Sequence, residues 1–434
     1  MNCVIGLDIG TSAIKCVAVS EEIEIISAVE KKFEYCYPAV GQVVIDADKY
    51  LATVTAAIRE LVDKLPANVV ITSVCQASAS GNLILLDEAS QPLTPIFNWR
   101  DHRVNDEITR VFGNLNEREV YETIGWQLGT TFPLAILCWI KCHQPEILKK
   151  AAYITMSTEY LNYFLTGEWG ISLSAGTPFY LIDQQRRKYH KPFLDGLGID
   201  ENQLPPIHER GTVIGKVKEK ASEITGLPIG TPVMLGTFDH PSAAIAAEVT
   251  KQGQMMLSAG TSWVLFYPVQ NREEAIKLDL LVDPFLSPNG CWGAMSSLTS
   301  ASEKISGYVE QFIADGDDRF ERLDELSAES IQGAGGLRIN IMEPPDIPAV
   351  SMYEKRHIAR AIMESAAITL REKMIRLERS GISADSVVMV GGPSKSKIWR
   401  EVISYILHKE VIGSEGSFTG AVGAAKIALH KSLL

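Results

Sequence analysis

Hydrophobic and polar residues follow two different periods along this chain, and the periods predict an alternation of strands and helices. Short apolar runs rich in β-branched residues predict strands at 5–9, 14–19, 23–29, 69–74, 83–86 and 386–390. Apolar residues at helical spacing predict helices at 46–64 and 355–379, a mostly helical stretch at 104–165, and helices beginning near 398 and 418. Such alternation is typical of α/β layers, in which helices cover a sheet.

The middle of the chain is rich in proline and glycine, which interrupt helices and strands. Several of each lie between residues 205 and 232, and they predict a domain seam near 230–236. A length of 434 residues is enough for two or three domains of roughly 150 residues each. We therefore expect an N-terminal domain over 1–232 and a C-terminal domain over 233–434.

Composition narrows the class of protein. The chain is 46% apolar and 22% charged, which is typical of a globular protein, and its formal charge of −12 argues against a general binder of nucleic acid or anionic membranes. The seven cysteines form no CxxC pair, and we interpret Cys138 and Cys142 as ordinary thiols rather than metal ligands. No apolar run reaches the ~20 residues that span a bilayer. We expect a cytoplasmic protein without nucleic-acid or membrane partners, and a homodimer is compatible with the sequence.

The first two predicted strands enclose a turn with candidate phosphate chemistry. Asp8 lies where the first strand ends, and Gly10, Thr11 and Ser12 form the turn. Lys15 adds a positive charge, Gly10 permits close backbone approach, and Asp8 is suited to a hydrated metal ion. The alternative is an ordinary hairpin with an incidental acid.

A second stretch has the same pattern. An apolar run ends at the turn residues Gly260, Thr261 and Ser262, and another apolar run follows at 264–267. Shortly before it, the run at 233–238 brings Asp239 and His240 to a predicted strand end. Two such hairpins about 250 residues apart indicate two structurally related halves.

Two further segments carry candidate ligand contacts. The loop at 95–103 places Trp99, Asp101 and Arg103 close together, either as an apolar wall and hydroxyl acceptor for a polar substrate or as an Asp101–Arg103 ion pair that fixes the loop. After the buried strand at 386–390, glycines allow a flat ring or phosphate to meet the backbone, although a plain turn is the alternative. The residues in this second segment are Gly391, Gly392 and Ser394.

In their order, these motifs resemble the FGGY carbohydrate kinases, and most closely the xylulose-kinase-like branch. The resemblance rests on residues 8–12, 99–103, 159–168, 239, 260–262, 391–396 and 399–400 and runs nearly end to end. It implies the actin-like ATPase fold, in which two ribonuclease-H-like α/β domains, each a mixed sheet flanked by helices, surround a central cleft.

The resemblance also implies roles for individual residues. Asp239 corresponds to the catalytic base of the family. Asp8 and Asp239 correspond to the residues that face the metal ion of a Mg²⁺–ATP site. The phosphate and adenosine contacts correspond to Thr11, Ser12, Lys15, Gly260, Thr261, Ser262, Gly391, Gly392 and Ser394. The implied reaction is ATP-dependent phosphorylation of a hydroxyl of a ketopentose, deoxy-ketohexose or polyol.

The chain departs from the family where the sugar is expected. Xylulose kinases that resemble it carry Gly-Gln-Met-His-Gly at the place where this chain has residues 78–82, so the Met and the His are absent. The candidate sugar contacts are therefore Ser80, Asn82, Trp99, Asp101, Arg103 and His240. Two other functions stay open at this point: a sensor of sugar or nucleotide on the same fold, and an ATPase without a sugar substrate.

Overall fold

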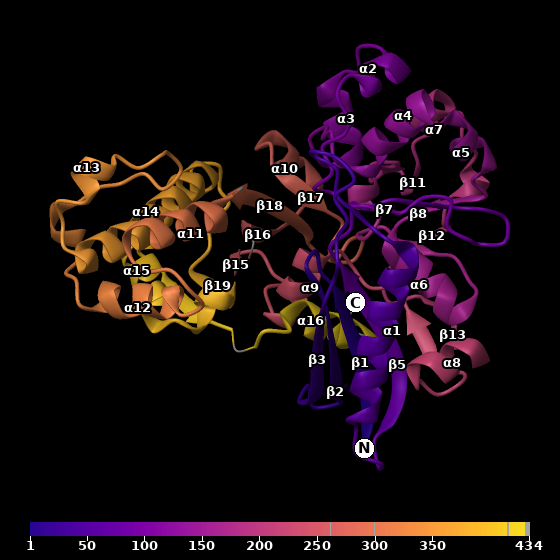
Figure 1. Ribbon diagram of the computed structural model, residues 1–434, viewed down its shortest axis with the longest axis horizontal. Helices are drawn as coiled ribbons and strands as arrows, with labels where there is room; N and C mark the ends of the chain where they lie inside the picture. Colours follow the sequence, from indigo (N-terminus) through magenta and orange to yellow (C-terminus); the bar gives the residue numbers. More distant parts are fainter. Residues whose placement is uncertain (261, 299, 415, 430–434) are drawn as a thin grey trace. The chain divides into compact units, whose positions relative to one another are not determined.

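The structure is a computed structural model that describes residues 1–260, 262–298, 300–414 and 416–429. The chain forms two compact units. Unit 1 comprises Met1–Ala246, Leu281–Gly290 and the segment that begins at Gly420, and unit 2 comprises Ala247–Leu280 and Cys291–Thr419. Each unit contains a mixed sheet flanked by helices, as the sequence pattern predicts (Figure 1).

Unit 1 is the larger of the two. Its strands are β1 (Asn2–Ile9), β2 (Ala13–Ser20), β3 (Ile25–Lys32), β4 (Val44–Ile45), β5 (Val70–Ser78), β6 (Ile84–Leu86), β7 (Ile96–Phe97), β8 (Tyr153–Thr155), β9 (Ile171–Ser172), β10 (Ile182–Asp183), β11 (Lys188–Tyr189), β12 (Ile207–His208), β13 (Val213–Lys216), β14 (Pro232–Met234) and β17 (Leu281–Asp283). Its helices are α1 (Ala47–Asp63), α2 (Glu107–Phe112), α3 (Glu117–Ile124), α4 (Pro133–His143), α5 (Pro145–Lys150), α6 (Ser157–Thr166), α7 (Lys191–Leu197), α8 (Glu219–Thr225), α9 (Asp239–Ala246) and α16 (Thr419–Leu429).

Unit 2 has longer helices and fewer strands. Its strands are β15 (Gln254–Ala259), β16 (Trp263–Val269), β18 (Trp292–Leu298), β19 (Ser386–Gly391) and β20 (Glu410–Gly413). Its helices are α10 (Arg272–Lys277), α11 (Ala301–Phe312), α12 (Arg319–Ala328), α13 (Ile347–Val350), α14 (Lys355–Glu378) and α15 (Lys397–Leu407). Figure 1 shows α14 among α11, α12 and α15, and α14 contacts all three.

The two main sheets repeat one order of strands. Five strands of the first sheet lie in the order β3-β2-β1-β5-β14, with β13 beyond β14, and the five strands of unit 2 lie in the order β18-β16-β15-β19-β20. In both sheets the first two pairings of this order are antiparallel and the last two are parallel. The hairpin β1–β2 therefore corresponds to β15–β16, which confirms the prediction of two related halves.

Helix α1 shows why the local sequence folds as it does. Asp46 caps its N-terminus, because its Oδ1 accepts from the backbone N–H of Asp48 at 3.1 Å and of Lys49 at 3.0 Å. The apolar positions predicted from the sequence point inward, and Val54 and Ile58 are fully buried. The helix contacts β2 and β3, so its apolar face covers that side of the sheet.

The boundary between the units differs from the expected one. A seam was predicted near 230–236, but β14 pairs with β5 inside the first sheet. The prolines and glycines near 230–236 do not end the unit, because backbone pairing holds this segment in the sheet. Unit 1 therefore continues through α9 to Ala246. The predicted stretch at 104–165 is helical in five segments and is interrupted by β8.

Glycines allow α16 to lie directly on unit 1. A Cβ on Gly6 of β1 would stand 2.0 Å from the carbonyl oxygen of Ala421, and a Cβ on Gly423 would stand 1.8 Å from that of Ser242. Ser242 of α9 also donates a hydrogen bond of 2.8 Å to the carbonyl of Gly420. The close approach of backbones therefore joins β1, α9 and α16.

Candidate functional site

The first candidate turn joins β1 to β2. Asp8 pairs with Lys15 across the two strands, and the Gly10 N–H donates to the Ala13 carbonyl at 3.0 Å. Thr11 is held by two aromatic residues, because its Oγ1 accepts from Trp99 Nε1 at 2.9 Å and its carbonyl accepts from the Tyr35 hydroxyl. The turn is thus fixed by side chains from two other segments.

Asp8 has an unusual environment for a carboxylate. Its Oδ1 is buried and has no hydrogen-bond partner among the described residues. Burial, followed by repulsion from Asp239, raises the pKa of Asp8 to about 7, although Lys15 acts in the opposite direction. A Cβ on Gly420 would stand 2.5 Å from Asp8 Oδ2, so the start of α16 forms the floor beneath this carboxylate.

Asp239 is the first residue of α9. Its Oδ1 accepts from the backbone N–H of His240 at 2.7 Å, and burial raises the pKa of Asp239 above its ordinary value. His240 is half-buried and lies edge-on to the ring of Phe238, with 5.5 Å between centroids. Both carboxylates belong to unit 1, and repulsion from Asp239 contributes to the raised pKa of Asp8.

These two carboxylates fit a magnesium ion. Mg²⁺ is usually bound by one or two carboxylates together with waters and substrate phosphates, rather than by a full set of protein ligands. No group of three or more His, Cys, Asp or Glu residues among the described ones forms a complete metal cage. The unpartnered Oδ1 of Asp8 is an oxygen free to accept a cation or its water.

The loop after β7 contains a buried ion pair. Asp101 is fully buried, and Arg103 binds both of its oxygens, with Nε at 2.8 Å from Oδ1 and Nη2 at 2.9 Å from Oδ2. The Val43 N–H also donates to Oδ2 at 2.7 Å. The Arg103 guanidinium lies over the rings of Phe97 and Trp139. The structure therefore contains the internal pair that was one of the two interpretations of this loop.

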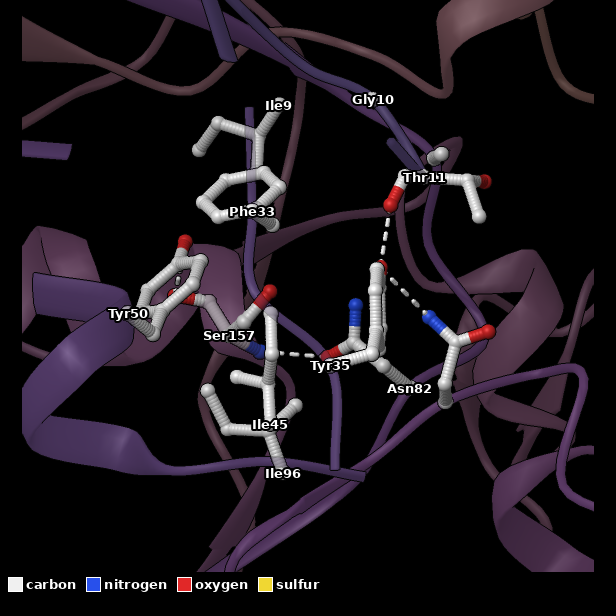
Figure 2. A pocket seen from close by; sticks show the side chains of 12 residues that line it. Ile9, Gly10, Thr11, Phe33, Tyr35, Ile45, Tyr50, Asn82, Ile96 and Ser157 are labelled. Atoms are coloured by element: carbon white, nitrogen blue, oxygen red, sulfur yellow. Dashed lines mark hydrogen bonds between the residues drawn. The ribbon is translucent and has the colours of Figure 1, made fainter. Parts of the chain in front are cut away.

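Ser80 and Asn82 are also buried. Asn82 Oδ1 accepts from the Ser157 N–H at 2.7 Å, which satisfies a backbone donor at the start of α6. The Ser80 hydroxyl lies 3.5 Å from the carbonyl of Ser78. Asn82, with Gly10 and Thr11, lines a small cavity of about 20 Å³ that has both polar and apolar walls (Figure 2). This volume is sufficient for about one water molecule.

Unit 2 contains a larger pocket of about 640 Å³. Its lining residues come from both sides of the second hairpin, from α11 and α12, and from the turn after β19: Ala259, Gly260, Trp263, Ser302, Ile305, Phe320, Glu321, Asp324, Gly392, Pro393, Lys395, Ser396 and Trp399. The indole rings of Trp263 and Trp399 meet edge to face at 5.3 Å. The pocket is therefore an apolar slot with a few polar groups at its rim.

The predicted contacts of this second region separate into two groups. Gly260 and Gly392 line the pocket. Gly391 and Ser394 instead shape the turn: Gly391 has φ +96° and would clash with the Ala259 carbonyl if it carried a Cβ, and the Ser394 hydroxyl donates to the Gly391 carbonyl at 2.7 Å. Ser262 is half-buried beside them, and Thr261 lies outside the described residues.

Sequence reasoning missed several residues of this pocket. Phe320 and Asp324 belong to α12, and Ser302 belongs to α11. Burial raises the pKa of Asp324, while a hydrogen bond with Ser396 lowers it. These residues lie in amphipathic helices without a motif, and only the three-dimensional packing of α11 and α12 brings them to the turn after β19.

The chain matches two consecutive domains of one family. Residues 3–246 match the N-terminal domain of the FGGY family of carbohydrate kinases, and residues 255–432 match its C-terminal domain. The chain belongs to the FGGY family of carbohydrate kinases. As an FGGY carbohydrate kinase it is an enzyme that phosphorylates a sugar, and it is xylulokinase-like in sequence.

Relatives of this FGGY kinase act on different substrates. It is 25% identical to the xylulose kinase of Bacillus subtilis over 100% of this chain and 89% of the relative. It is 24% identical to the autoinducer-2 kinase of Salmonella typhimurium over 98% of this chain and 86% of the relative. Because the relatives are almost equally similar, they leave the particular substrate open.

Solved structures show the fold. The xylulose kinase of Rhodospirillum rubrum superimposes with a TM-score of 0.88 at 23% identity, over 99% of this chain and 90% of that chain. The glycerol kinase of Plasmodium falciparum with ADP superimposes with a TM-score of 0.85 at 19% identity, over 100% and 90% of the two chains. The two units thus have the actin-like ATPase fold, as predicted. None of the helices in the described part of this FGGY kinase is long and apolar enough to cross a membrane.

Proposed function

We propose that this kinase transfers the terminal phosphoryl group of ATP to a hydroxyl of a small sugar or polyol, with Asp239 as the general base. One observation supports the proposal: Asp8 near the end of β1 and Asp239 at the start of α9 both belong to unit 1, burial raises the pKa of each, and repulsion from Asp239 adds to the rise at Asp8. A base with a raised pKa accepts a proton more readily, and general-base catalysis contributes about 10²–10⁴-fold to the rate.

The surrounding residues would position the reactants. Phosphoryl transfer depends mostly on alignment and on neutralising charge around the phosphates. Thr11, Ser12 and the Lys15 ammonium stand at the turn beside Asp8, where backbone N–H groups and a positive charge suit phosphate oxygens. Asp8, with Asp239, would hold Mg²⁺, which when bound supplies positive charge that offsets the phosphates.

The pocket of unit 2 is our candidate for the adenosine end of ATP. Its backbone at Gly260 and Gly392 is open to a flat ring, and Trp263 and Trp399 offer an apolar wall. We assign Thr261 and Ser262 to the phosphate side of this hairpin, since they follow Gly260 in the sequence as Thr11 and Ser12 follow Gly10. Gly391 and Ser394 support the pocket through the shape of the turn.

The proposed sugar contacts come from three segments of unit 1, at residues 78–82, 95–103 and 239–240. Asp101 and Arg103 are occupied by each other, so their contribution to the sugar site would be to hold the loop that carries Trp99. Ser80, Asn82, Trp99 and His240 remain the candidates for direct contact. Because the Met and His of xylulose kinases are absent at 78–82, we propose that xylulose is a poor substrate and that a related ketose or polyol is preferred.

Replacing the proposed base tests the mechanism. The substitution Asp239→Asn preserves size and removes the proton acceptor, and we expect kcat to fall by about 10²-fold or more while ATP still binds. The measurement is ADP release in a coupled assay with and without sugar. Sugar-independent ADP release would instead identify an ATPase, no release would identify a sensor, and near-normal turnover of Asp239→Asn would exclude the base.

A panel of sugars tests the substrate class. Ketopentoses, deoxy-ketohexoses and polyols would be compared by kcat/KM for sugar-dependent ADP release. We expect xylulose to rank below at least one other member, because a pocket built for a different hydroxyl pattern leaves polar groups unpaired. If xylulose has the highest kcat/KM, the interpretation of residues 78–82 fails while the kinase assignment stands.

A further inference from the structure

A fully buried carboxylate, Asp283 at the end of β17, lies outside the motifs discussed so far. Its partners are neutral groups. The Ser174 hydroxyl lies 3.0 Å from Oδ1 and 2.9 Å from Oδ2, and the Phe285 N–H donates to Oδ1 at 2.6 Å. Hydrogen bonds to a carboxylate are short and directional, so Asp283 fixes where the Ser174 hydroxyl proton points.

Ser174 connects Asp283 to the backbone next to Asp239, the candidate base. While its proton is directed at Asp283, its oxygen accepts from the backbone N–H of Phe238 at 3.1 Å. Phe238 immediately precedes Asp239. The three groups therefore form a continuous chain from a buried carboxylate, through one hydroxyl, to the backbone at the residue before Asp239.

The origin of this chain, β17, is itself held firmly. The Val282 carbonyl accepts from Trp126 Nε1 at 3.1 Å and from Gln184 Nε2 at 2.9 Å, and the Val282 N–H donates to the Gly125 carbonyl at 2.9 Å. The Trp126 ring also packs edge to face against Phe238, with 5.4 Å between centroids. Both the backbone and the side chain of Phe238 are thus held by the surroundings of β17.

We propose that Asp283 and Ser174 are positioning residues that fix the Phe238 backbone and thereby aim the Asp239 carboxylate at the sugar hydroxyl. This inference rests on the proposed function of Asp239. An isolated acid at a helix start would be free to change its backbone angles, whereas a near-attack geometry is sensitive to shifts of an ångström, which cost on the order of 10²-fold in rate.

The first test compares two buried serines of the same segment. The substitution Ser174→Ala removes the link to Phe238, whereas Ser172→Ala removes a hydroxyl whose hydrogen bond among the described residues comes from the nearby Ala175 N–H at 3.1 Å. Both serines are almost fully buried. We expect a similar loss of melting temperature in both variants, but a fall in kcat of about tenfold, with the KM for ATP unchanged, only for Ser174→Ala.

Two conservative variants separate positioning from folding. Ser174→Thr retains the hydroxyl and should recover most of the kcat that Ser174→Ala loses. Asp283→Asn retains the shape but can replace Oδ2, which lies 2.9 Å from the Ser174 hydroxyl, by an NH2 group that cannot accept, so kcat should fall several-fold with an unchanged KM for ATP. Should Ser174→Ala not fold, the Asp283→Asn variant alone decides by the same comparison of kcat with KM.

The result that overturns the inference differs from the one that overturns the proposed function. If Ser174→Ala and Asp283→Asn keep kcat within twofold of the parent while Asp239→Asn abolishes turnover, the positioning role is wrong and the base stands. An equal fall of kcat in Ser172→Ala and Ser174→Ala also overturns it, because the effect would then be general loss of packing. Normal turnover of Asp239→Asn removes the proposed function itself.

Discussion

Carboxylates in unit 1 differ in what surrounds them, and the surroundings decide which ones are available for chemistry. Asp101 is fully buried, but both its oxygens are bound by Arg103 and by backbone. Asp8 is enclosed without a partner for Oδ1. Removing one member of a buried ion pair costs roughly 3–5 kcal/mol, so Asp101 contributes mainly to holding its loop. Asp8 has capacity left for a ligand.

Gly420 leads to a prediction at the scale of one residue. A Cβ at this position would stand 2.5 Å from Asp8 Oδ2, so Gly420→Ala must displace either the carboxylate or α16. We expect kcat to fall by about 10–10²-fold, as a misplaced catalytic group does. The measurement is steady-state kinetics over a Mg²⁺ titration, together with a thermal melt.

A matched control comes from a glycine in another helix. Gly307 lies in α11, is exposed, and has no atom within 4 Å of an added Cβ. Gly307→Ala should therefore leave kcat unchanged and raise the free energy of unfolding by about 0.4–1 kcal/mol. Unchanged kinetics of Gly420→Ala would show that the position of Asp8 does not depend on its close contact with α16.

Local patterns found some site residues and could not find others. Asp8 and Asp239 were predicted because each follows an apolar run, and the end of a strand is visible in the sequence. Ser174 and Asp283 are 109 positions apart, and their contact depends on where β17 inserts in unit 1. No periodicity in either segment specifies that placement.

At the scale of an element, α6 contains a buried acidic side chain whose ionisation is disfavoured. Glu159 is 1% exposed, and burial raises its pKa to about 8, although backbone N–H groups of Met156 and Glu159 act in the opposite direction. Its Oε2 has no partner among the described residues. The folded state therefore retains a proton on Glu159 at pH values at which the unfolded chain, with a pKa near 4.3, has already lost it.

This difference predicts a pH dependence. Its contribution to stability is fully present below pH ~4 and is lost as pH rises toward and through about 8, because the folded state binds the extra proton over that window. Glu159→Gln removes the titration. We expect its melting temperature to rise relative to that of the parent as pH increases from 5 to 9.

The exposed neighbour Glu168, just beyond the end of α6, supplies the control. Glu168→Gln should shift the melting temperature equally at every pH in this range. A parallel pH dependence of Glu159→Gln and the parent would mean that Glu159 ionises normally in the folded protein, and the burial argument for α6 would be wrong.

The ends of a helix were predictable where the apolar periodicity extends over several turns. The helix predicted at 355–379 is observed as Lys355–Glu378, and the helix predicted at 46–64 is observed as Ala47–Asp63. Both repeat an apolar face over several turns, which leaves little freedom in the assignment. Short strands such as β9 and β12 escaped prediction, because two residues contain no period and their pairing is set by distant contacts.

At the scale of the whole molecule, the proposed sugar and metal contacts belong to unit 1, and the proposed adenosine pocket belongs to unit 2. The apolar pocket of about 640 Å³ belongs to unit 2, and Phe320 lines it while remaining 42% exposed. If adenosine stacks there, Phe320→Ala should weaken ADP binding by about 3–10-fold, since an aromatic pair contributes ~0.5–1.5 kcal/mol beyond buried area. Titration calorimetry with ADP measures the change.

Tyr405 is a suitable control, because it is an aromatic residue of unit 2 with 45% exposure that lines a different cavity. Tyr405→Ala should leave ADP affinity unchanged. Equal ADP affinity of Phe320→Ala and the parent would place the nucleotide elsewhere. The repeated hairpins made two halves predictable from the sequence, but the extent of unit 1 was not, because it is assembled from three separate stretches.

The floor that α16 forms beneath Asp8 has a consequence for folding during translation. During translation β1, with Asp8 and Gly6, is made before the α16 residues that pack on them, which lie more than 400 positions later in the chain. In the interval the chain completes nearly all of unit 2. The floor beneath Asp8 therefore cannot form on a nascent chain until α16 has been synthesised.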